Sequence, residues 1–171
     1  MEEKKTRQPV RLYALAVALV VILDQALKYW VEANIPLDPV RGEQIPMIPG
    51  LFHLSHIRNS GVAFGMLQGG RWAFLVLLAV FCGLVVWAVR TGWLATPWER
   101  WLAVLCLGGA LGNGIDRALH GYVVDMLEVE FMSFPVFNLA DCAITVSAVL
   151  FVLLTLLPRK ETETKDPDRK E

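Results

Sequence analysis

Charged residues and cysteines are both scarce in this chain of 171 residues. Aspartate, glutamate, lysine and arginine together make up 19% of it, and there are three cysteines. This composition excludes an intrinsically disordered chain and a nucleic-acid binder with a basic face. The cysteines all lie inside apolar runs, which is typical of small buried thiols rather than of disulfides, redox centres or metal sites. The length allows one domain, or two small ones.

Apolar residues are abundant where charged residues are few. Hydrophobic residues make up 55% of the chain, and the mean hydropathy is +0.47. Four long apolar stretches cover residues 12–31, 72–89, 101–115 and 136–157. A helix that spans a bilayer needs about 20 mostly apolar residues, and an irregular segment cannot satisfy its backbone groups in hydrocarbon. We therefore predict an all-α membrane protein with four transmembrane helices.

The first apolar stretch follows a basic segment, as the core of a secretory signal peptide does. However, the helix-like pattern continues to Val31, and no small-residue cleavage site follows residues 12–23. We interpret this stretch as a retained membrane anchor.

Lysine and arginine gather before the first stretch, between the second and third, and after the fourth. The excess of positive charge marks the cytoplasmic side, so we expect both termini there. We expect a cytoplasmic tail at residues 1–10, a transmembrane domain at 11–157 and a disordered, charge-rich cytoplasmic tail at 158–171.

The longer outer connection, about residues 33–70, carries the pattern of a small extracytoplasmic β-sheet. Apolar and polar residues alternate over 51–58, and Asn59-Ser60-Gly61 follows as a turn. This predicts a strand, a turn and a second strand at 62–66. A further β-prone run, 122–124, directly precedes Asp125 in the shorter outer connection.

Polar groups at membrane depth cost about 2.5–3.5 kcal/mol each on insertion scales, so their position is informative. In this topology they all fall at the outer ends of the first, third and fourth helices, and Asn59 and Asp125 lie in the outer connections. The helix residues are Asp24, Lys28, Asn113, Asp116, Arg117, Asn138 and Asp141. We therefore predict one polar layer near the outer leaflet.

Several of these residues also have a purely structural interpretation. Asp24 and Lys28 are four residues apart, the spacing of an ion pair within a helix. Asp116 and Arg117 can form an interfacial pair that closes the third helix. Asn138 can cap the amino end of the fourth helix.

Asp141 is harder to explain structurally, because it lies in an apolar span with no basic residue nearby in the sequence. Asp125 is the nearest acidic residue on the same side of the membrane. Two close carboxylates share a proton, so one can act as general base on a water and the other as general acid. Such a pair hydrolyses amides without a covalent intermediate. Serine chemistry has no support, since the chain lacks a Gly-x-Ser-x-Gly motif.

Metal chemistry has no support either. His53, His56 and His120 lack metal-ligand spacing to other candidates, and we expect all three at the surface.

Five short motifs resemble, in order and spacing, those of the lipoprotein signal peptidases (signal peptidase II), over residues 12–157. They are Asp24-Gln25-x-x-Lys28, Asn59-Ser60-Gly61-Val62-Ala63-Phe64, Gly112-Asn113-Gly114-Ile115-Asp116-Arg117, Val123-Val124-Asp125 and Phe137-Asn138-Leu139-Ala140-Asp141. The resemblance implies a four-helix membrane aspartyl protease of the bacterial inner membrane with a small extracytoplasmic sheet. Its substrates would be prolipoproteins, cut before a cysteine that carries a diacylglyceryl group.

The same resemblance implies a role for each matching residue. Asp125 and Asp141 would be the catalytic pair. The residues that line the site and bind substrate would be Asn59, Gly61, Asn113, Arg117, Asn138 and Ala140. Asp24, Lys28 and Asp116 would hold the helix ends together. Met126 departs from the family pattern, which often has Phe there. We expect no metal or cofactor, a monomer, membrane lipids and a prolipoprotein as partners, and no nucleic acid.

Two other functions compete with the protease. One is a small proton- or ion-coupled transporter that uses intramembrane aspartates, although transporter sites usually lie near the midplane and come with internal repeats. The other is a membrane scaffold without enzymatic activity, to which the Gly108-x-x-x-Gly112 spacing lends slight support.

Overall fold

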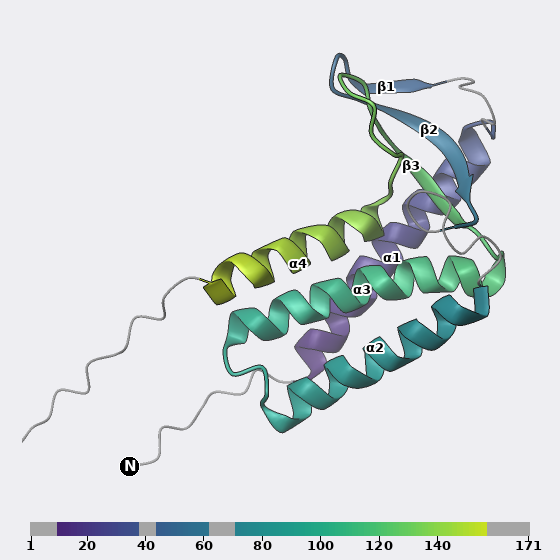
Figure 1. Cartoon of the computed structure of the whole chain (residues 1–171). Helices are drawn as coiled ribbons and strands as arrows, with labels where there is room; N and C mark the ends of the chain where they lie inside the picture. Colours follow the sequence, from purple (N-terminus) through teal and green to yellow (C-terminus); the bar gives the residue numbers. More distant parts are fainter. Residues whose placement is uncertain (1–9, 38–43, 62–70, 157–171) are drawn as a thin grey trace, which may run out of the picture.

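The computed structural model describes residues 10–37, 44–61 and 71–156 (Figure 1). The helices are α1 (Val10–Asn34), α2 (Arg71–Thr91), α3 (Pro97–Leu119) and α4 (Leu139–Leu156). The strands are β1 (Ile45–Ile48), β2 (Phe52–Asn59) and β3 (Val123–Val129). All four helices are long and apolar enough to cross a membrane. The prediction of four transmembrane helices and a small sheet is therefore confirmed.

Helix α3 is the centre of the bundle, because it packs against α1, α2 and α4. Glycines make this packing close. At Gly112 an added Cβ would lie 2.5 Å from Oδ2 of Asp24 on α1, and at Gly109 an added Cβ would lie 2.5 Å from the carbonyl oxygen of Ala140 on α4. Small residues allow membrane helices to approach in this way. The polar ends of α1, α3 and α4 are thereby brought within hydrogen-bonding distance.

The start of α3 follows from its sequence. The Thr96 side chain accepts a hydrogen bond from the Glu99 amide, and the Glu99 carboxylate accepts one from the Thr96 amide, at 3.3 and 2.8 Å. This reciprocal capping box, followed by Pro97 at the first helical position, fixes the first turn.

The three strands form one antiparallel sheet in the order β1-β2-β3. Pro46 lies in β1, where an edge strand tolerates a residue that cannot donate to the ladder. The strand expected at 51–58 is β2, and the β-prone run at 122–124 leads into β3. The second strand expected at 62–66 and the tails expected at both termini lie outside the described residues, except for Val10, which begins α1.

The sheet packs against the carboxyl-terminal end of α1 and the residue that follows it. Val31 and Ile35 form a buried cluster with Leu54 of β2 and with Val124 and Met126 of β3. Because side chains alternate across a strand, Asp125 projects from the opposite face to its two neighbours. The alternation that anchors β3 on α1 therefore also aims Asp125 at the helix ends.

His56 is buried, so the expectation that all three histidines lie at the surface was wrong for this residue. Its side chain is 2% exposed, and Nδ1 lies 2.8 Å from the carbonyl oxygen of Ile35. The register of β2 against β3 shifts between Leu54 and Ile57. Leu54, two positions earlier in β2, is in the cluster with Ile35. The partner of the His56 imidazole lies 21 positions away in the sequence, so no local pattern shows this contact.

Candidate active site

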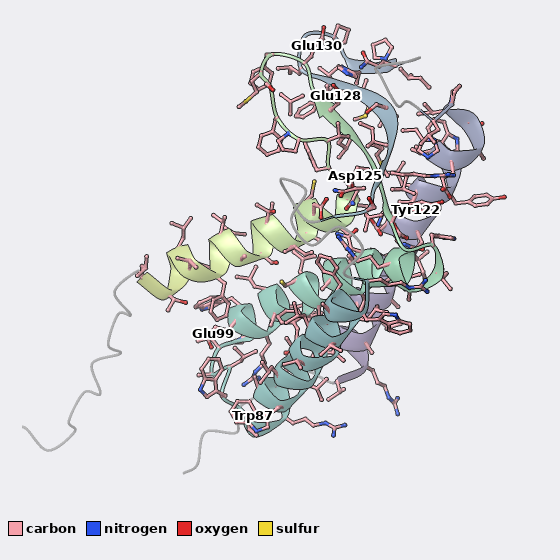
Figure 2. All side chains as sticks on the ribbon, turned by 45° about the vertical axis from the view of Figure 1, so that its right-hand side comes forward. Trp87, Glu99, Tyr122, Asp125, Glu128 and Glu130 are labelled. Carbon is pink, nitrogen blue, oxygen red and sulfur yellow. The ribbon has the colours of Figure 1, made fainter. Side chains whose placement is uncertain are left out.

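Asp125 is held by two asparagines. Its Oδ1 accepts a hydrogen bond from Nδ2 of Asn138 at 2.7 Å, and its Oδ2 accepts one from Nδ2 of Asn59 at 2.9 Å. The residue is 2% exposed. Figure 2 shows Asp125 where the sheet meets the helix ends, whereas Glu99 and Trp87 lie toward the other end of the bundle.

Asp141 lies in the first turn of α4 and is held there by a capping box. Oδ1 of Asn138 accepts a hydrogen bond from the Asp141 amide at 2.9 Å, and Oδ2 of Asp141 accepts one from the Asn138 amide at 3.2 Å. The sequence-based interpretation of Asn138 as a helix cap is confirmed. Oδ1 of Asp141 also accepts a hydrogen bond from Nδ2 of Asn113 at 2.7 Å.

Asn138 joins the two acids. Its side-chain nitrogen donates to Asp125, and its side-chain oxygen and backbone amide both bond to Asp141. The Asn138 side chain has no exposed surface. The aspartates, separated by 16 positions in sequence, therefore lie on either side of one fixed amide group.

Asp24, Lys28 and Asp116 form a buried network of charged side chains next to this pair. Lys28 forms ion pairs with Asp24 at 2.8 Å and with Asp116 at 2.9 Å, and its third proton goes to Oδ1 of Asn113 at 2.9 Å. The ion pair expected between Asp24 and Lys28 is confirmed. An ammonium has three protons to donate, and here each has an acceptor. Buried ions require such complete pairing.

The two carboxylates of this network also connect elements. Oδ1 of Asp24 accepts a hydrogen bond from the Ala140 amide at 3.0 Å, which ties α1 to α4. Oδ2 of Asp116 accepts one from the Val124 amide at 3.2 Å, which ties α3 to β3. Ala140 has no exposed surface, so it does not line an accessible part of the site.

Gln25 belongs to this network, and the sequence analysis did not single it out. Its side-chain nitrogen donates to Oδ1 of Asp116 at 2.8 Å and to the Gly112 carbonyl at 3.2 Å. The only signal in the sequence was its position inside the Asp24-Gln25-x-x-Lys28 motif.

Arg117 does not close α3 by pairing with Asp116, which instead pairs with Lys28. Its guanidinium donates to the Gly61 carbonyl at 3.3 Å and to the Asn113 carbonyl at 3.4 Å, and lies 4.5 Å from the centre of the Phe74 ring. The Gly61 amide in turn donates to Oδ1 of Asn59 at 3.1 Å. Arg117 thus fixes the turn after β2 against α3.

Burial raises the pKa of the Asp125 carboxyl to about 6. The negative charge of Asp141 acts in the same direction, while the hydrogen bonds from Asn59 and Asn138 and the charge of Lys28 lower this pKa in part. A carboxyl group with a pKa near 6 can hold a proton when a neighbouring carboxylate is ionised. This is the condition for one acid and one base in the same site.

Two cavities with different linings adjoin the site. One, of about 320 Å³, borders Asp125 and is walled by residues 57–61 and 135–136. The other, of about 250 Å³, begins at Arg117 and follows apolar side chains of α2 and α3, including Phe74 and Leu78. Among the described residues, no group of three or more histidine, cysteine or acidic side chains could hold a metal ion.

Comparison with known proteins identifies relatives over most of the chain. A family model described as signal peptidase (SPase) II matches residues 16–157. The lipoprotein signal peptidases of Streptococcus pyogenes serotype M2 (strain MGAS10270) and serotype M5 (strain Manfredo) are 37% and 36% identical to this chain over 143 residues, which cover 84% of this chain and 91% of each relative.

Two solved structures, both described as a bacterial membrane enzyme, have the same fold. One matches with a TM-score of 0.80 over 96% of both chains, and the other with a TM-score of 0.79 over 90% of this chain and 98% of its own. Both are 28% identical to this chain. The family match, the relatives and the shared fold agree, and this chain belongs to the signal peptidase II family.

Proposed function

We propose that this protein is an aspartic endopeptidase of the bacterial inner membrane that removes the signal peptide from prolipoproteins, cutting before a diacylglyceryl-modified cysteine. The observation that carries the proposal is the pair of aspartates bonded to opposite parts of Asn138. Family membership gives the substrate class, and the relatives are named lipoprotein signal peptidases.

Asp125 is the proton donor in this proposal and Asp141 is the base. Asp125 is nearly inaccessible to water, and burial favours its neutral form. Asp141 is less buried and lies at the amino end of α4, where the helix dipole favours negative charge. It also accepts hydrogen bonds from the Asn113 side chain and the Asn138 amide. The surroundings of two identical side chains therefore separate their roles.

Hydrolysis then proceeds through a tetrahedral diol. Asp141 takes a proton from water as the water oxygen attacks the carbonyl carbon, and Asp125 gives its proton to the carbonyl oxygen. Asp141 next passes its proton to the leaving nitrogen as the C–N bond breaks, and Asp125 recovers a proton from the diol. The products are a carboxylic acid on the signal peptide and a free amine on the lipidated cysteine, with both aspartates restored.

The other polar residues position this pair. Asn59 and Asn138 hold Asp125, and Asn113 and Asn138 hold Asp141. Arg117 anchors the turn at Gly61, which adjoins the site. All of these residues come from one chain, so we propose that a monomer is sufficient for activity.

The scissile bond would lie at the outer leaflet, with both termini of the enzyme in the cytoplasm. The apolar groove between α2 and α3 that begins at Arg117 suits an apolar signal peptide. The acyl chains on the cysteine remain in the lipid, where each buried CH₂ contributes about 0.8 kcal/mol. The transporter alternative is disfavoured, because Asp24, Asp116, Asp125 and Asp141 are linked where the sheet meets the helix ends rather than near the middle of the helices.

A cleavage assay tests this function. The purified protein, in lipid, is given a diacylglyceryl-modified precursor peptide and its unlipidated twin. We expect cleavage immediately before the cysteine in the lipidated peptide, and a rate at least about a hundredfold lower for the twin. Failure to cleave the lipidated precursor, or cleavage at another bond, would contradict the proposal.

A further inference from the structure

The cavity of about 320 Å³ beside Asp125 has no role in the mechanism above, yet it borders the acid directly. Its walls are the end of β2, the turn that follows it, and residues 135–136 before α4. None of its lining residues belongs to a membrane-spanning helix. It shares no lining residue with the apolar groove between α2 and α3.

Ile57 is the side chain best placed to shape this cavity. It is the direct partner of Asp125 in the β2–β3 ladder, and directly paired residues project from the same face of a sheet. Val136 forms part of the opposite wall. Arg58, Asn59, Ser60 and Asp125 contribute polar groups, so the lining is partly apolar and partly polar.

The walls are fixed by hydrogen bonds. The Phe137 carbonyl accepts hydrogen bonds from the amides of Met126 and Leu127 at 3.0 and 2.7 Å, which holds the segment before α4 against β3. On the other side, Asn59 and Arg117 hold Gly61 through its amide and its carbonyl. A cavity with walls restrained in this way can discriminate by size, because neither side yields easily to a larger group.

We propose that this cavity binds the side chain of the substrate residue that directly follows the lipidated cysteine, and that Ile57 and Val136 limit its size. This rests on the proposed function. In an extended substrate, successive side chains point to opposite sides. Because the cysteine side chain carries the acyl chains and must point to the lipid, the next side chain points away from it. The half-polar cavity on the outer side of Asp125 then receives it, about 3.3 Å farther along the chain.

Four diacylglyceryl peptides that differ only in the residue after the cysteine test this inference. That residue is Gly, Ser, Leu or Trp, and kcat/KM is measured for each peptide. We expect the Trp peptide to be cleaved at least about tenfold less efficiently than the Ser peptide by the unmodified enzyme. The ratio of the two values is taken within each enzyme variant, so the fraction of folded protein cancels.

Ile57→Ala and Val136→Ala should enlarge the cavity and raise the Trp-to-Ser ratio by at least about fivefold. Ser60→Leu should fill the cavity and lower the ratio of kcat/KM for the Leu peptide to that for the Gly peptide. Ile48→Ala is the matched control, because Ile48 is an exposed residue of edge strand β1 outside the cavity. Its ratios should equal those of the unmodified enzyme.

A Trp-to-Ser ratio near one in the unmodified enzyme would overturn the inference, and so would a ratio unchanged by both Ile57→Ala and Val136→Ala. Either result, with the Ser peptide still cleaved before its cysteine, leaves the proposed function intact. If the unmodified enzyme cleaves none of the four peptides, the proposed function itself fails.

Discussion

At the scale of single residues, the two aspartates of the site have the same side chain but different surroundings. Asp125 is buried between Asn59 and Asn138, whereas Asp141 lies in the first turn of a helix with a backbone amide among its donors. Burial favours a neutral carboxyl group at Asp125. In the proposed mechanism one residue donates a proton while the other accepts one, so neither can substitute for the other.

Replacement of either acid by its amide should abolish cleavage while the protein remains folded. Asp125→Asn removes the proton donor and Asp141→Asn removes the base, and each should lower kcat/KM at least about a hundredfold. The control is Glu128→Gln, which makes the same chemical change on β3 at a residue that pairs with His53. Residual activity within about tenfold of the unmodified enzyme in either aspartate variant would exclude the acid pair.

The activity should depend on pH through Asp125. Because the mechanism needs Asp125 protonated and its pKa is raised to about 6, kcat/KM should fall by about tenfold per pH unit above that value. The fall follows from the sign of the shift, since a carboxyl group loses its proton as the pH rises through its pKa. A pH series on the lipidated precursor measures this, with folding checked at each pH. A flat profile from pH 5 to 9 would contradict the assignment.

At the scale of elements, the acid pair exists because α3 approaches α1 and α4 closely. Lys28 of α1 bonds to Asp116 and Asn113 of α3, and Asn113 bonds to Asp141 of α4. Each of these contacts is shorter than 3.0 Å, so a small displacement of α1 would break the chain of contacts.

Gly112→Ala should displace α1 and impair both stability and activity. The added Cβ would lie 2.5 Å from Oδ2 of Asp24 and 3.4 Å from Cβ of Ala140. We expect a loss of about 1–3 kcal/mol in stability, together with reduced cleavage. Gly83→Ala on α2 is the control, since an added Cβ there meets nothing within 4 Å. Thermal unfolding in detergent and the cleavage assay provide the two readouts, and equal behaviour of the two variants would refute the packing argument.

At the scale of the whole molecule, the aspartates and asparagines of the site lie at one end of an apolar bundle. The sheet and the acid pair lie at that end, and the connection between α2 and α3 lies at the other (Figure 1). The positive-inside pattern predicts that the sheet end lies outside the cytoplasm.

Labelling of single cysteines tests this orientation. Starting from a variant with Cys82, Cys106 and Cys142 replaced by alanine, Ser133→Cys should react with a membrane-impermeant thiol reagent in intact spheroplasts. Ala95→Cys, in the connection between α2 and α3, should react only after the membrane is opened. Both positions are exposed, so a difference in labelling between them cannot come from burial within the fold. The reverse pattern of labelling would invert the proposed topology.

Local sequence determined much of this protein. Apolar runs of sufficient length predicted the four spans, the strand pattern at 51–58 predicted β2, and the place of Asn138 at the start of the fourth helix predicted a helix cap. These features depend on residues that are close in the chain, so a period or a motif is enough to reveal them. The five motifs also indicate the family from the sequence alone.

Only the tertiary structure decided which of these residues meet. Lys28 bridges two carboxylates that lie far apart in sequence, Asn138 bonds to both acids, and His56 contacts the carbonyl oxygen of Ile35 in the core. Such contacts depend on how closely glycines let α1 and α4 approach α3 and on the register between β2 and β3. Hydrophobic periodicity fixes which face of an element is buried, but it does not encode which partner that face will meet.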